Sequence, residues 1–466
     1  MGAGRQKNQE GLIQQKLAFE GEEEVKPRTN SGEGTEAPVA EGNAESPTTS
    51  EQLMEVILGR ENLKEALKRV KGNKGAAGVD GMRVGELNGY LKDHWKLLRE
   101  ELLKGTYKPQ PVRRVEIEKP GGGVRKLGIP TVVDRFIQQA VMQVLQREWD
   151  GTFSEHSYGF RPGRTAHQAV AKAQEYISAG YEVVVDIDLE KFFDRVNHDI
   201  LMSRVARRVS DKRVLRLIRA YLNAGVMEDG LVSATEEGTP QGGPLSPLLS
   251  NLLLDEVDKE LEKRGHLFVR YADDSNIYVR SERAGERVME GMKKYLSKRL
   301  KLKVNEQKSA VGKPSERKFL GFSFTKGEGP RRQISKESEK RFKKRVREQT
   351  QRGGRSLQRV VDDLGRYVRG WVGYYGKCET KSQLRELESW MRRRLRCYVW
   401  KQWKKPRRRF LELTRRGVEA RHAGRVAIWN GYGPWRVSRS AALSKALPNA
   451  YFRSLGLPTM TAERVV

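Results

Sequence analysis

Cysteine and histidine are scarce in this sequence. Its 466 residues include only two cysteines, Cys378 and Cys397, and six scattered histidines. Two isolated cysteines form neither a disulfide framework nor a zinc finger. The histidines lack the spacing of metal ligands, so no His/Cys metal nuclease is visible. These shortages exclude a disulfide-stabilised scaffold and a zinc finger.

Long apolar runs are also missing. No stretch reaches the roughly 18–20 consecutive apolar residues that a membrane-spanning helix requires. The N-terminus lacks the charged and then apolar segments of a secretory signal. We therefore expect a soluble intracellular protein that has no membrane partner.

Positive charge dominates what is present, and it is unevenly distributed. The formal net charge is +30. Residues 331–416 carry 29 Lys or Arg against nine Asp or Glu, whereas residues 1–50 carry five against nine. A charge this large favours a polyanion such as nucleic acid as partner, because phosphates offset the self-repulsion. The first 50 residues are rich in Gly, Glu, Ser, Thr and Pro, which predicts a disordered acidic tail.

The hydrophobic pattern alternates between strand and helix up to about residue 330. Strand patterns occur at 111–130, 181–188 and 267–280, and the first and third of these segments predict β-hairpins. From about residue 335 the pattern is helical, with aromatic residues among Arg and Lys. The sequence therefore predicts an α+β fold, with helices packed on an antiparallel sheet, followed by an all-helical basic domain.

Two adjacent aspartates lie at the predicted tip of the hairpin at 267–280. Asp273 and Asp274 repel each other there, and a divalent cation would offset that repulsion. A plain hydrophilic turn explains the same residues, because aspartate favours turns. The apolar strands on both sides weaken that alternative, since they place the tip on a core hairpin.

A second acidic segment follows the predicted strand at 181–188. Asp186 and Asp188 are two residues apart, so they share one face of a strand. Phosphoryl transfer by two metal ions needs carboxylates from separate segments, and this segment with the hairpin meets that need. Asp186 also fits a strand-end carboxylate, and Asp188 also fits a helix N-cap.

Two motifs now resemble a known family. Residues 271–274, Tyr-Ala-Asp-Asp, resemble the Tyr-x-Asp-Asp box of reverse transcriptases, and residues 188–194 resemble the first catalytic box of their group II intron-encoded branch. That branch has its metal-binding aspartate five residues before an aromatic. Asp188 satisfies the spacing with Phe193, whereas Asp186 would place a lysine there. We therefore assign the metal-binding role to Asp188.

The resemblance implies a set of catalytic and metal-binding groups. They are Asp188, Asp273 and Asp274, with the backbone carbonyl of Leu189 as a further metal ligand. The implied cofactor is a pair of Mg²⁺ ions, for which Mn²⁺ is a substitute. Phe193 resembles the aromatic gate that excludes a ribose 2′-hydroxyl, although a core aromatic beside Phe192 fits the same position.

Further boxes follow in the order of the family. Residues 239–247, Thr-Pro-Gln-Gly-Gly-Pro-Leu-Ser-Pro, resemble the segment that packs against template and incoming nucleotide, and residues 305–309 resemble the downstream lysine box. The nucleotide contacts that the resemblance implies are Lys119, Arg125, Phe193, Gln241 and Lys308. Lys308 would give a proton to the leaving pyrophosphate, and a solvated surface lysine is the alternative.

Nucleic-acid contacts are implied in two parts of the chain. Residues 157–164 match the family closely, and residues 370–375 with 384–403 resemble its thumb, or maturase, domain. The implied contacts are Arg161, Gly242, Arg392, Arg393, Arg394, Lys404, Lys405, Arg407 and Arg408. For the residues beyond 390 a solvated basic face is the alternative.

The resemblance implies a right-hand polymerase fold, in which fingers and palm contain an antiparallel sheet and an all-helical basic thumb follows. The expected domains follow from these matches. They are a disordered acidic tail at 1–50, an N-terminal extension with the start of the fingers at 51–110, fingers and palm at 111–330, a thumb or maturase domain at 331–416, and a short DNA- or RNA-binding segment at 417–466. Many relatives continue into a His/Cys-rich endonuclease domain, and this sequence shows none. It most resembles the bacterial class C branch in that respect.

The implied function is that of an RNA-directed DNA polymerase encoded by a group II intron. Its expected partners are deoxynucleoside triphosphates, an RNA template with a DNA primer, target DNA and the intron RNA, whose splicing it would assist as a maturase. Mobility by target-primed reverse transcription is expected, in the bacterial cytoplasm and at the nucleoid, and an oligomer is compatible. Two alternatives stay open: a domesticated reverse transcriptase in defence or repair, and an RNA-binding splicing cofactor without catalysis.

Overall fold

A computed structural model describes residues 52–118, 123–228, 231–233, 237–239, 242–351, 354–428 and 433–461. The expected acidic tail, Lys119 and Gln241 lie outside the described residues. The chain divides into two compact units, one reaching Gly312 and the other comprising Gln174–Gly180 and the residues from Lys313 onward. These units are defined by packing, and the expected boundary between palm and thumb at 330–331 stays a prediction.

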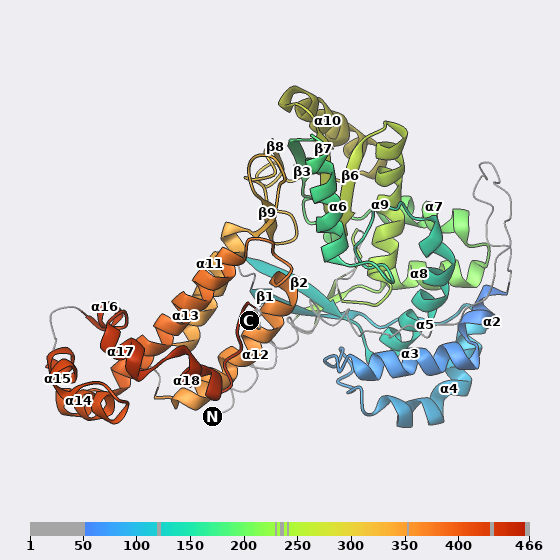
Figure 1. The fold of residues 1–466 in the computed structure, drawn as a ribbon. Coiled ribbons are helices and arrows are strands. Elements are labelled where there is room, and N and C mark those ends of the chain that lie inside the picture. Colours follow the sequence, from blue (N-terminus) through green and yellow to red (C-terminus); the bar gives the residue numbers. More distant parts are fainter. Residues whose placement is uncertain are drawn as a thin grey trace, which may run out of the picture. The chain divides into compact units, whose positions relative to one another are not determined.

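Helices make up much of the first unit (Figure 1). They are α2 (Leu53–Ile57), α3 (Arg60–Gly72), α4 (Leu87–Lys104), α5 (Val132–Trp149), α6 (Ala166–Ser178), α7 (His198–Arg208), α8 (Lys212–Asn223), α9 (Ser246–Lys263) and α10 (Glu282–Tyr295), and the last residues of α6, from Gln174, belong to the second unit. Side chains that prefer N-cap positions begin several of them. Asn197 and Asp211, for example, accept hydrogen bonds from backbone N–H groups in the first turns of α7 and α8.

Two four-stranded sheets accompany these helices. The first has the order β2-β1-β4-β5 and the second has the order β6-β7-β3-β8. Their strands are β1 (Val112–Glu118), β2 (Val124–Ile129), β3 (Val183–Ile187), β4 (Val226–Glu228), β5 (Leu231–Ser233), β6 (Leu267–Tyr271), β7 (Asp274–Val279) and β8 (Ala310–Gly312). Every pair in the second sheet is antiparallel. The hairpins that the sequence predicts at 111–130 and 267–280 are β1–β2 and β6–β7.

The second sheet is buried against helices. Figure 1 shows α10 beside strands β3 and β7, and α10 packs on both strands. Gly285 allows this approach, because a side chain there would meet Val311 and Val185. All five residues of β3 are buried. The strand that leads to the acidic segment is therefore a central strand of the core, as its apolar sequence predicts.

The second unit combines a small sheet with helices. Its elements are β9 (Phe322–Phe324), β10 (Arg332–Ile334), α11 (Lys336–Gln349), α12 (Leu357–Tyr375), α13 (Lys381–Gln402), α14 (Pro406–Arg415), α15 (Ala420–Ile428), α16 (Gly433–Val437), α17 (Ala441–Ala446) and α18 (Asn449–Ser454). Aromatic residues form its core: the Trp371 ring lies 4.7 Å from Phe342 and 4.6 Å from Tyr375. Among the helices of the described residues, none is both long and apolar enough to cross a membrane.

Candidate active site

The hairpin β6–β7 presents two aspartates at its tip. Tyr271 pairs with Asp274, so Ala272 and Asp273 form a two-residue turn. Ala272 has φ +58°, a left-handed conformation that a residue with a Cβ rarely adopts. The strands on both sides are largely buried. The turn therefore belongs to a core hairpin, as the sequence predicts.

Asp186 and Asp188 differ in their surroundings. Asp186 lies inside β3, is 9% exposed and stands opposite Asn276 in β7. With its amide nitrogen facing Asp186, Asn276 donates a hydrogen bond of 3.2 Å to that carboxylate. Asp188 follows the strand, and its side chain is 39% exposed. This difference supports Asp188 as the residue that reaches a substrate.

The backbone of Asp188 is held by the segment 305–309. The Ser309 hydroxyl accepts a hydrogen bond from the Asp188 N–H at 2.9 Å and donates one to the Asp188 carbonyl at 3.2 Å. The Asn305 N–H donates to the same carbonyl at 2.8 Å. Lys308 Nζ lies 3.5 Å from Asp188 Oδ2. The predicted lysine box thus lies directly against the first acidic segment.

Leu189 faces Val304 in an isolated antiparallel bridge. The two hydrogen bonds of the bridge use the Asp188 carbonyl and the Glu190 N–H. In such a pair the residue between those bonds directs its own N–H and C=O to the other side. The Leu189 carbonyl therefore takes no part in the bridge.

A cleft of about 1380 Å³ connects these residues. Asp188, Phe193, Asp273 and Lys308 all line it, as does Lys126 of β2. Small-molecule pockets usually measure about 300–1,000 Å³, so the cleft exceeds the space that one nucleotide needs. Strand β2 and the segments that follow β3 and β6 thus border one open site that contains carboxylates from two segments.

Phe192 and Phe193 are neighbours that differ in their exposure. Both lie in the short helix η2 (Phe192–Asp194), with ring centroids 5.2 Å apart. Phe192 is 2% exposed and packs in the core. Phe193 is partly exposed and lines the cleft. Phe192 thus takes a core position, whereas Phe193 packs partly against the core and also borders the cleft, and its role as a gate stays a prediction.

Within the described part of the chain, no group of three or more His, Cys, Asp or Glu side chains is gathered closely enough to hold a metal ion. Asp188, Leu189 and Asp273 nevertheless border the same cleft. Carboxylate and carbonyl oxygens are the hard donors that Mg²⁺ prefers. The donor chemistry fits the ion, and the ligand set remains a prediction.

Comparison with known proteins places this site in a family. The profile of the reverse transcriptase (RNA-dependent DNA polymerase) family matches residues 117–324, and that of the group II intron maturase-specific domain matches residues 339–417. Protein YkfC of Escherichia coli K12 is 35% identical over 301 residues, covering 56% of this chain and 79% of that protein. The chain belongs to the group II intron reverse transcriptase/maturase family.

Two further proteins are similar to this reverse transcriptase. Group II intron-encoded protein LtrA of Lactococcus lactis is 30% identical over 325 residues, covering 56% of this chain and 54% of that protein. A solved structure of a partial Cas6-RT-Cas1--Cas2 complex aligns with a TM-score of 0.35 and 24% identity, over 53% of this chain and 42% of that chain. The family matches confirm the predicted enzyme class and the α+β fingers and palm followed by a helical thumb.

Gly242 and Gly243 of the reverse transcriptase pack against its fingers. Gly242 has φ +134°, and a Cβ there would lie 2.5 Å from the Gly128 carbonyl oxygen. A Cβ on Gly243 would lie 2.3 Å from the Gln138 side-chain oxygen. The two glycines thus pack closely against β2 and α5, whereas the resemblance implies packing against template and nucleotide. A nucleic-acid contact by Gly242 remains a prediction.

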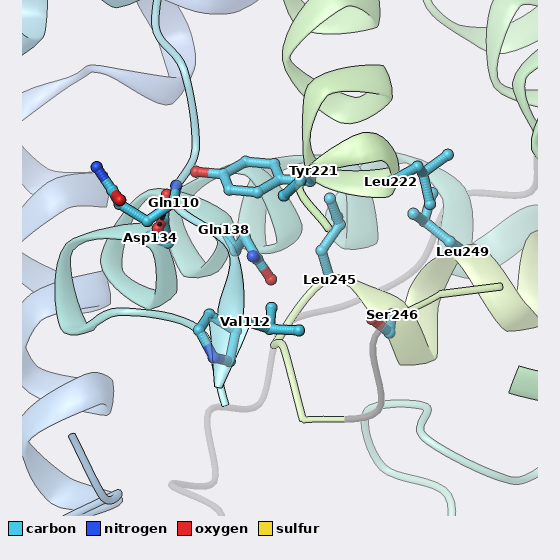
Figure 2. Close-up of a pocket in the computed structure, with 11 residues that line it drawn as sticks. Gln110, Val112, Asp134, Gln138, Tyr221, Leu222, Leu245, Ser246 and Leu249 are labelled. Atoms are coloured by element: carbon cyan, nitrogen blue, oxygen red, sulfur yellow. Dashed lines mark hydrogen bonds between the residues drawn. The ribbon is translucent and has the colours of Figure 1, made fainter. Parts of the chain in front are cut away.

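A second, much smaller cavity lies near this segment. Its volume is about 20 Å³, and Figure 2 shows Tyr221 of α8 reaching toward Gln110 beside Asp134. That volume holds about one water molecule, so it excludes a nucleotide. Burial raises the pKa of the Asp134 carboxyl, and hydrogen bonds from Thr131 and Tyr107 oppose the rise.

Arg161 lies in the protein interior, which argues against its expected contact with template or nucleotide. Its side chain is 4% exposed, and Nε donates to Asp150 Oδ1 at 2.9 Å. Nη1 donates to the carbonyls of Ser154 and Ser157 at 2.6 and 3.1 Å. The guanidinium thus holds its own loop together. The motif signalled an important arginine but not its burial.

The expected basic contacts of the second unit fall into two groups. Arg392, Arg393 and Arg394 bind other residues of the unit: Arg393 Nη2 donates to the Trp435 carbonyl at 2.8 Å, for example, and its guanidinium lies 3.8 Å from the Trp435 ring centre. A second set at the start of α14 is exposed: Lys404, Lys405, Arg407 and Arg408. The exposed set is better placed to meet phosphates.

Sequence reasoning missed residues that support the two acidic segments. They are Asn251, Asp258, Arg270 and Ser309, which contact the backbone of those segments or each other. A signal existed for Arg270, since a charged residue in an apolar strand needs a buried partner. Ser309 stands at the end of the box at 305–309, but the resemblance assigned no role to its hydroxyl.

Proposed function

We propose that this reverse transcriptase copies the RNA of a group II intron into DNA, with Asp188, Asp273 and Asp274 as its catalytic carboxylates. The observation that carries the proposal is the single cleft that Asp188, Asp273, Phe193 and Lys308 line together. The carboxylates come from two separate segments, as two-metal phosphoryl transfer requires. A splicing cofactor without catalysis has no need of this constellation.

The ligands for two Mg²⁺ ions would be Asp188, Asp273, Asp274 and the Leu189 carbonyl, and Mn²⁺ would substitute. When bound, the ions supply positive charge for the attack of a primer 3′-hydroxyl and the departure of pyrophosphate. Phe193 would exclude a ribose 2′-hydroxyl by its bulk. Lys308, beside Asp188, would donate a proton to pyrophosphate. Lys119, Arg125 and Gln241 would complete the contacts to the nucleotide.

Intron RNA is the proposed second ligand, bound by the maturase-specific domain. Lys404, Lys405, Arg407 and Arg408 are exposed there and lie within the matched range. Lysine and arginine contacts to phosphates depend on salt and carry little sequence choice. By this binding the protein would assist splicing and, with target DNA, intron mobility, in the bacterial cytoplasm and at the nucleoid.

Primer extension tests the catalytic part. The full chain is supplied with poly(rA)/oligo(dT), dTTP and Mg²⁺, and Asp273→Asn/Asp274→Asn is the matched variant. We expect extension by the parent and a loss of at least about a thousandfold in the variant. RNA binding without extension by the parent would leave only a splicing cofactor, whereas undiminished extension by the variant would overturn Asp273 and Asp274 as catalytic carboxylates.

Filter binding and splicing of the RNA that flanks the gene test the intron part. We expect Lys404→Gln/Lys405→Gln/Arg407→Gln/Arg408→Gln to weaken RNA binding and to make log Kd less dependent on log salt by about one unit per lost phosphate contact. Flanking DNA without an intron, together with normal primer extension, would favour a domesticated reverse transcriptase instead.

A further inference from the structure

A fully buried ion pair lies beneath the turn that carries Asp273. Arg270 of β6 is 1% exposed, and Asp258 of α9 is 0% exposed. Arg270 Nε lies 2.8 Å from Asp258 Oδ1, and Nη2 lies 2.5 Å from Oδ2. Burial raises the pKa of the Asp258 carboxyl, and the paired guanidinium opposes that rise. The pair joins α9 to the catalytic hairpin.

The rest of the guanidinium contacts the turn. Arg270 Nη1 donates to the Ala272 carbonyl at 3.0 Å and to Asn251 Oδ1 at 3.0 Å. Four of the five N–H groups of Arg270 therefore have acceptors. Only a planar fork reaches a carboxylate on one side and two neutral oxygens on the other. Arg270 thus connects two residues of α9 with the backbone of the turn.

The segment 156–159 encloses the same strand end. The Arg270 N–H donates to the His156 carbonyl at 2.9 Å, and the Tyr158 N–H donates to the Arg270 carbonyl at 2.9 Å. Asn251 Nδ2 donates to the Gly159 carbonyl at 2.8 Å. A Cβ on Gly159 would lie 2.3 Å from the Ala272 backbone nitrogen. The turn is therefore held by a side chain on one side and by close backbone packing on another.

Fold stability alone does not explain this arrangement. Hydrophobic residues of similar volume stabilise a core as well as a buried ion pair does, or better. The turn, in contrast, contains a strained left-handed alanine, and such a conformation persists only where the surroundings hold it. The guanidinium binds the carbonyl of that alanine.

We propose that Arg270 is a positioning residue, whose buried guanidinium, paired with Asp258, fixes the Ala272 carbonyl and thereby the direction in which Asp273 and Asp274 leave the turn. The inference rests on the proposed catalytic role of these two aspartates. Arg270 itself touches no substrate. Its effect is on the rate of the chemical step and on cation binding, and the binding of primer and template is left intact.

Arg270→Lys tests the proposal, because lysine keeps the charge but loses the fork. Arg270→Met/Asp258→Leu is the second variant, since it removes both charges together and preserves folding. Three quantities are measured on the full chain: kcat for primer extension, Kd for primer–template, and the half-saturating Mn²⁺ concentration from electron paramagnetic resonance. We expect kcat to fall about a hundredfold and the Mn²⁺ concentration to rise about tenfold, while Kd changes by less than about threefold.

Arg208→Lys is the matched control. Arg208 pairs with Asp255 of α9 at 3.5 Å, its side chain is 9% exposed, and it also contacts Thr152 and the rings of Trp149 and Phe153. We expect this variant to lower Tm and to leave kcat and Mn²⁺ binding unchanged. The proposal is overturned if both Arg270 variants fold and keep kcat and Mn²⁺ affinity within about twofold of the parent, or if Arg208→Lys reproduces their losses.

Asp273→Asn in the same assays separates the catalytic role of Asp273 from the positioning role of Arg270. If Asp273→Asn abolishes extension while the Arg270 variants remain active, only the positioning role is wrong. If Asp273→Asn extends normally, the proposed catalytic site is wrong, and the positioning role fails with it.

Discussion

The two segments that carry the carboxylates are held in different ways. The turn with Asp273 and Asp274 lies on buried side chains, above all the Arg270–Asp258 pair. Asp188 is held through its backbone by Ser309 and its neighbours, and its carboxylate is part-exposed beside Lys308. One segment is fixed by the interior of the protein, and the other is open to the cleft.

This difference predicts different responses to substrate. The carbonyl of Ala272 has its donor before any ligand arrives, so the direction of the turn is set in advance. Ion pairs that are partly exposed contribute only about 0–1 kcal/mol, so the Asp188 carboxylate can exchange Lys308 for a cation at little cost. The site thus combines a rigid half with an adjustable half.

Gly159→Ala should cause the largest loss of activity, because it disturbs the rigid turn that carries Asp273 and Asp274. The added methyl group would lie 2.3 Å from the Ala272 nitrogen, and backbone atoms cannot yield as a flexible side chain can. We expect primer extension to fall about a hundredfold or more, with a lower Tm. Gly151→Ala is the control, because a Cβ there meets nothing within 4 Å. A normal kcat in Gly159→Ala would show that the turn with Asp273 and Asp274 is not held rigidly.

Ser309→Ala removes the side chain that holds the backbone of Asp188. Its hydroxyl serves both the N–H and the carbonyl of Asp188. We expect a loss of about 1 kcal/mol in the free energy of unfolding and roughly a tenfold loss in kcat. Ser203→Ala serves as control, because its exposed hydroxyl donates to the Ile200 carbonyl and accepts from Arg204, both within α7. Equal kcat values in the two variants would contradict the role of Ser309.

Lys308→Gln should have the smallest effect, because it changes only the part-exposed ion pair with Asp188. Loss of the ammonium group at 3.5 Å removes a competitor for Asp188, so the half-saturating Mg²⁺ concentration should fall by up to about fivefold. A Mg²⁺ titration of primer extension measures this, and kcat at saturation reports separately on proton donation. Lys293→Gln is the control, because Lys293 pairs with Glu306 in the same cleft. A higher Mg²⁺ requirement in Lys308→Gln would contradict the exchange.

Local pattern made much of the site predictable. Asp273 and Asp274 stand between two apolar runs, so hairpin and tip follow from strand periodicity. The spacing from Asp188 to Phe193 selected Asp188 over Asp186, and the burial of Asp186 supports that choice. The hairpin needs only residues near one another in the chain, and the choice of Asp188 also needs the spacing that the resemblance to the family supplies.

Long-range burial could not be predicted in the same way. Arg161 occupies a loop with the composition of a surface segment, yet Asp150 and two carbonyls enclose it. Arg270 stands in an apolar strand, and it is buried there because Asp258 of α9 packs against it. Whether an arginine meets solvent or an interior acid depends on how separate segments pack, and the periodicity of one segment does not contain that information.

Single-nucleotide incorporation by Asp188→Asn and Asp186→Asn tests whether Asp188 is the catalytic carboxylate of its segment. Both substitutions replace one carboxylate oxygen with an amide nitrogen, in residues two positions apart. We expect Asp188→Asn to lose at least about a thousandfold in kcat, whereas Asp186→Asn, beside Asn276, should lose less than about tenfold. Loss of incorporation in Asp186→Asn together with normal incorporation in Asp188→Asn would contradict it.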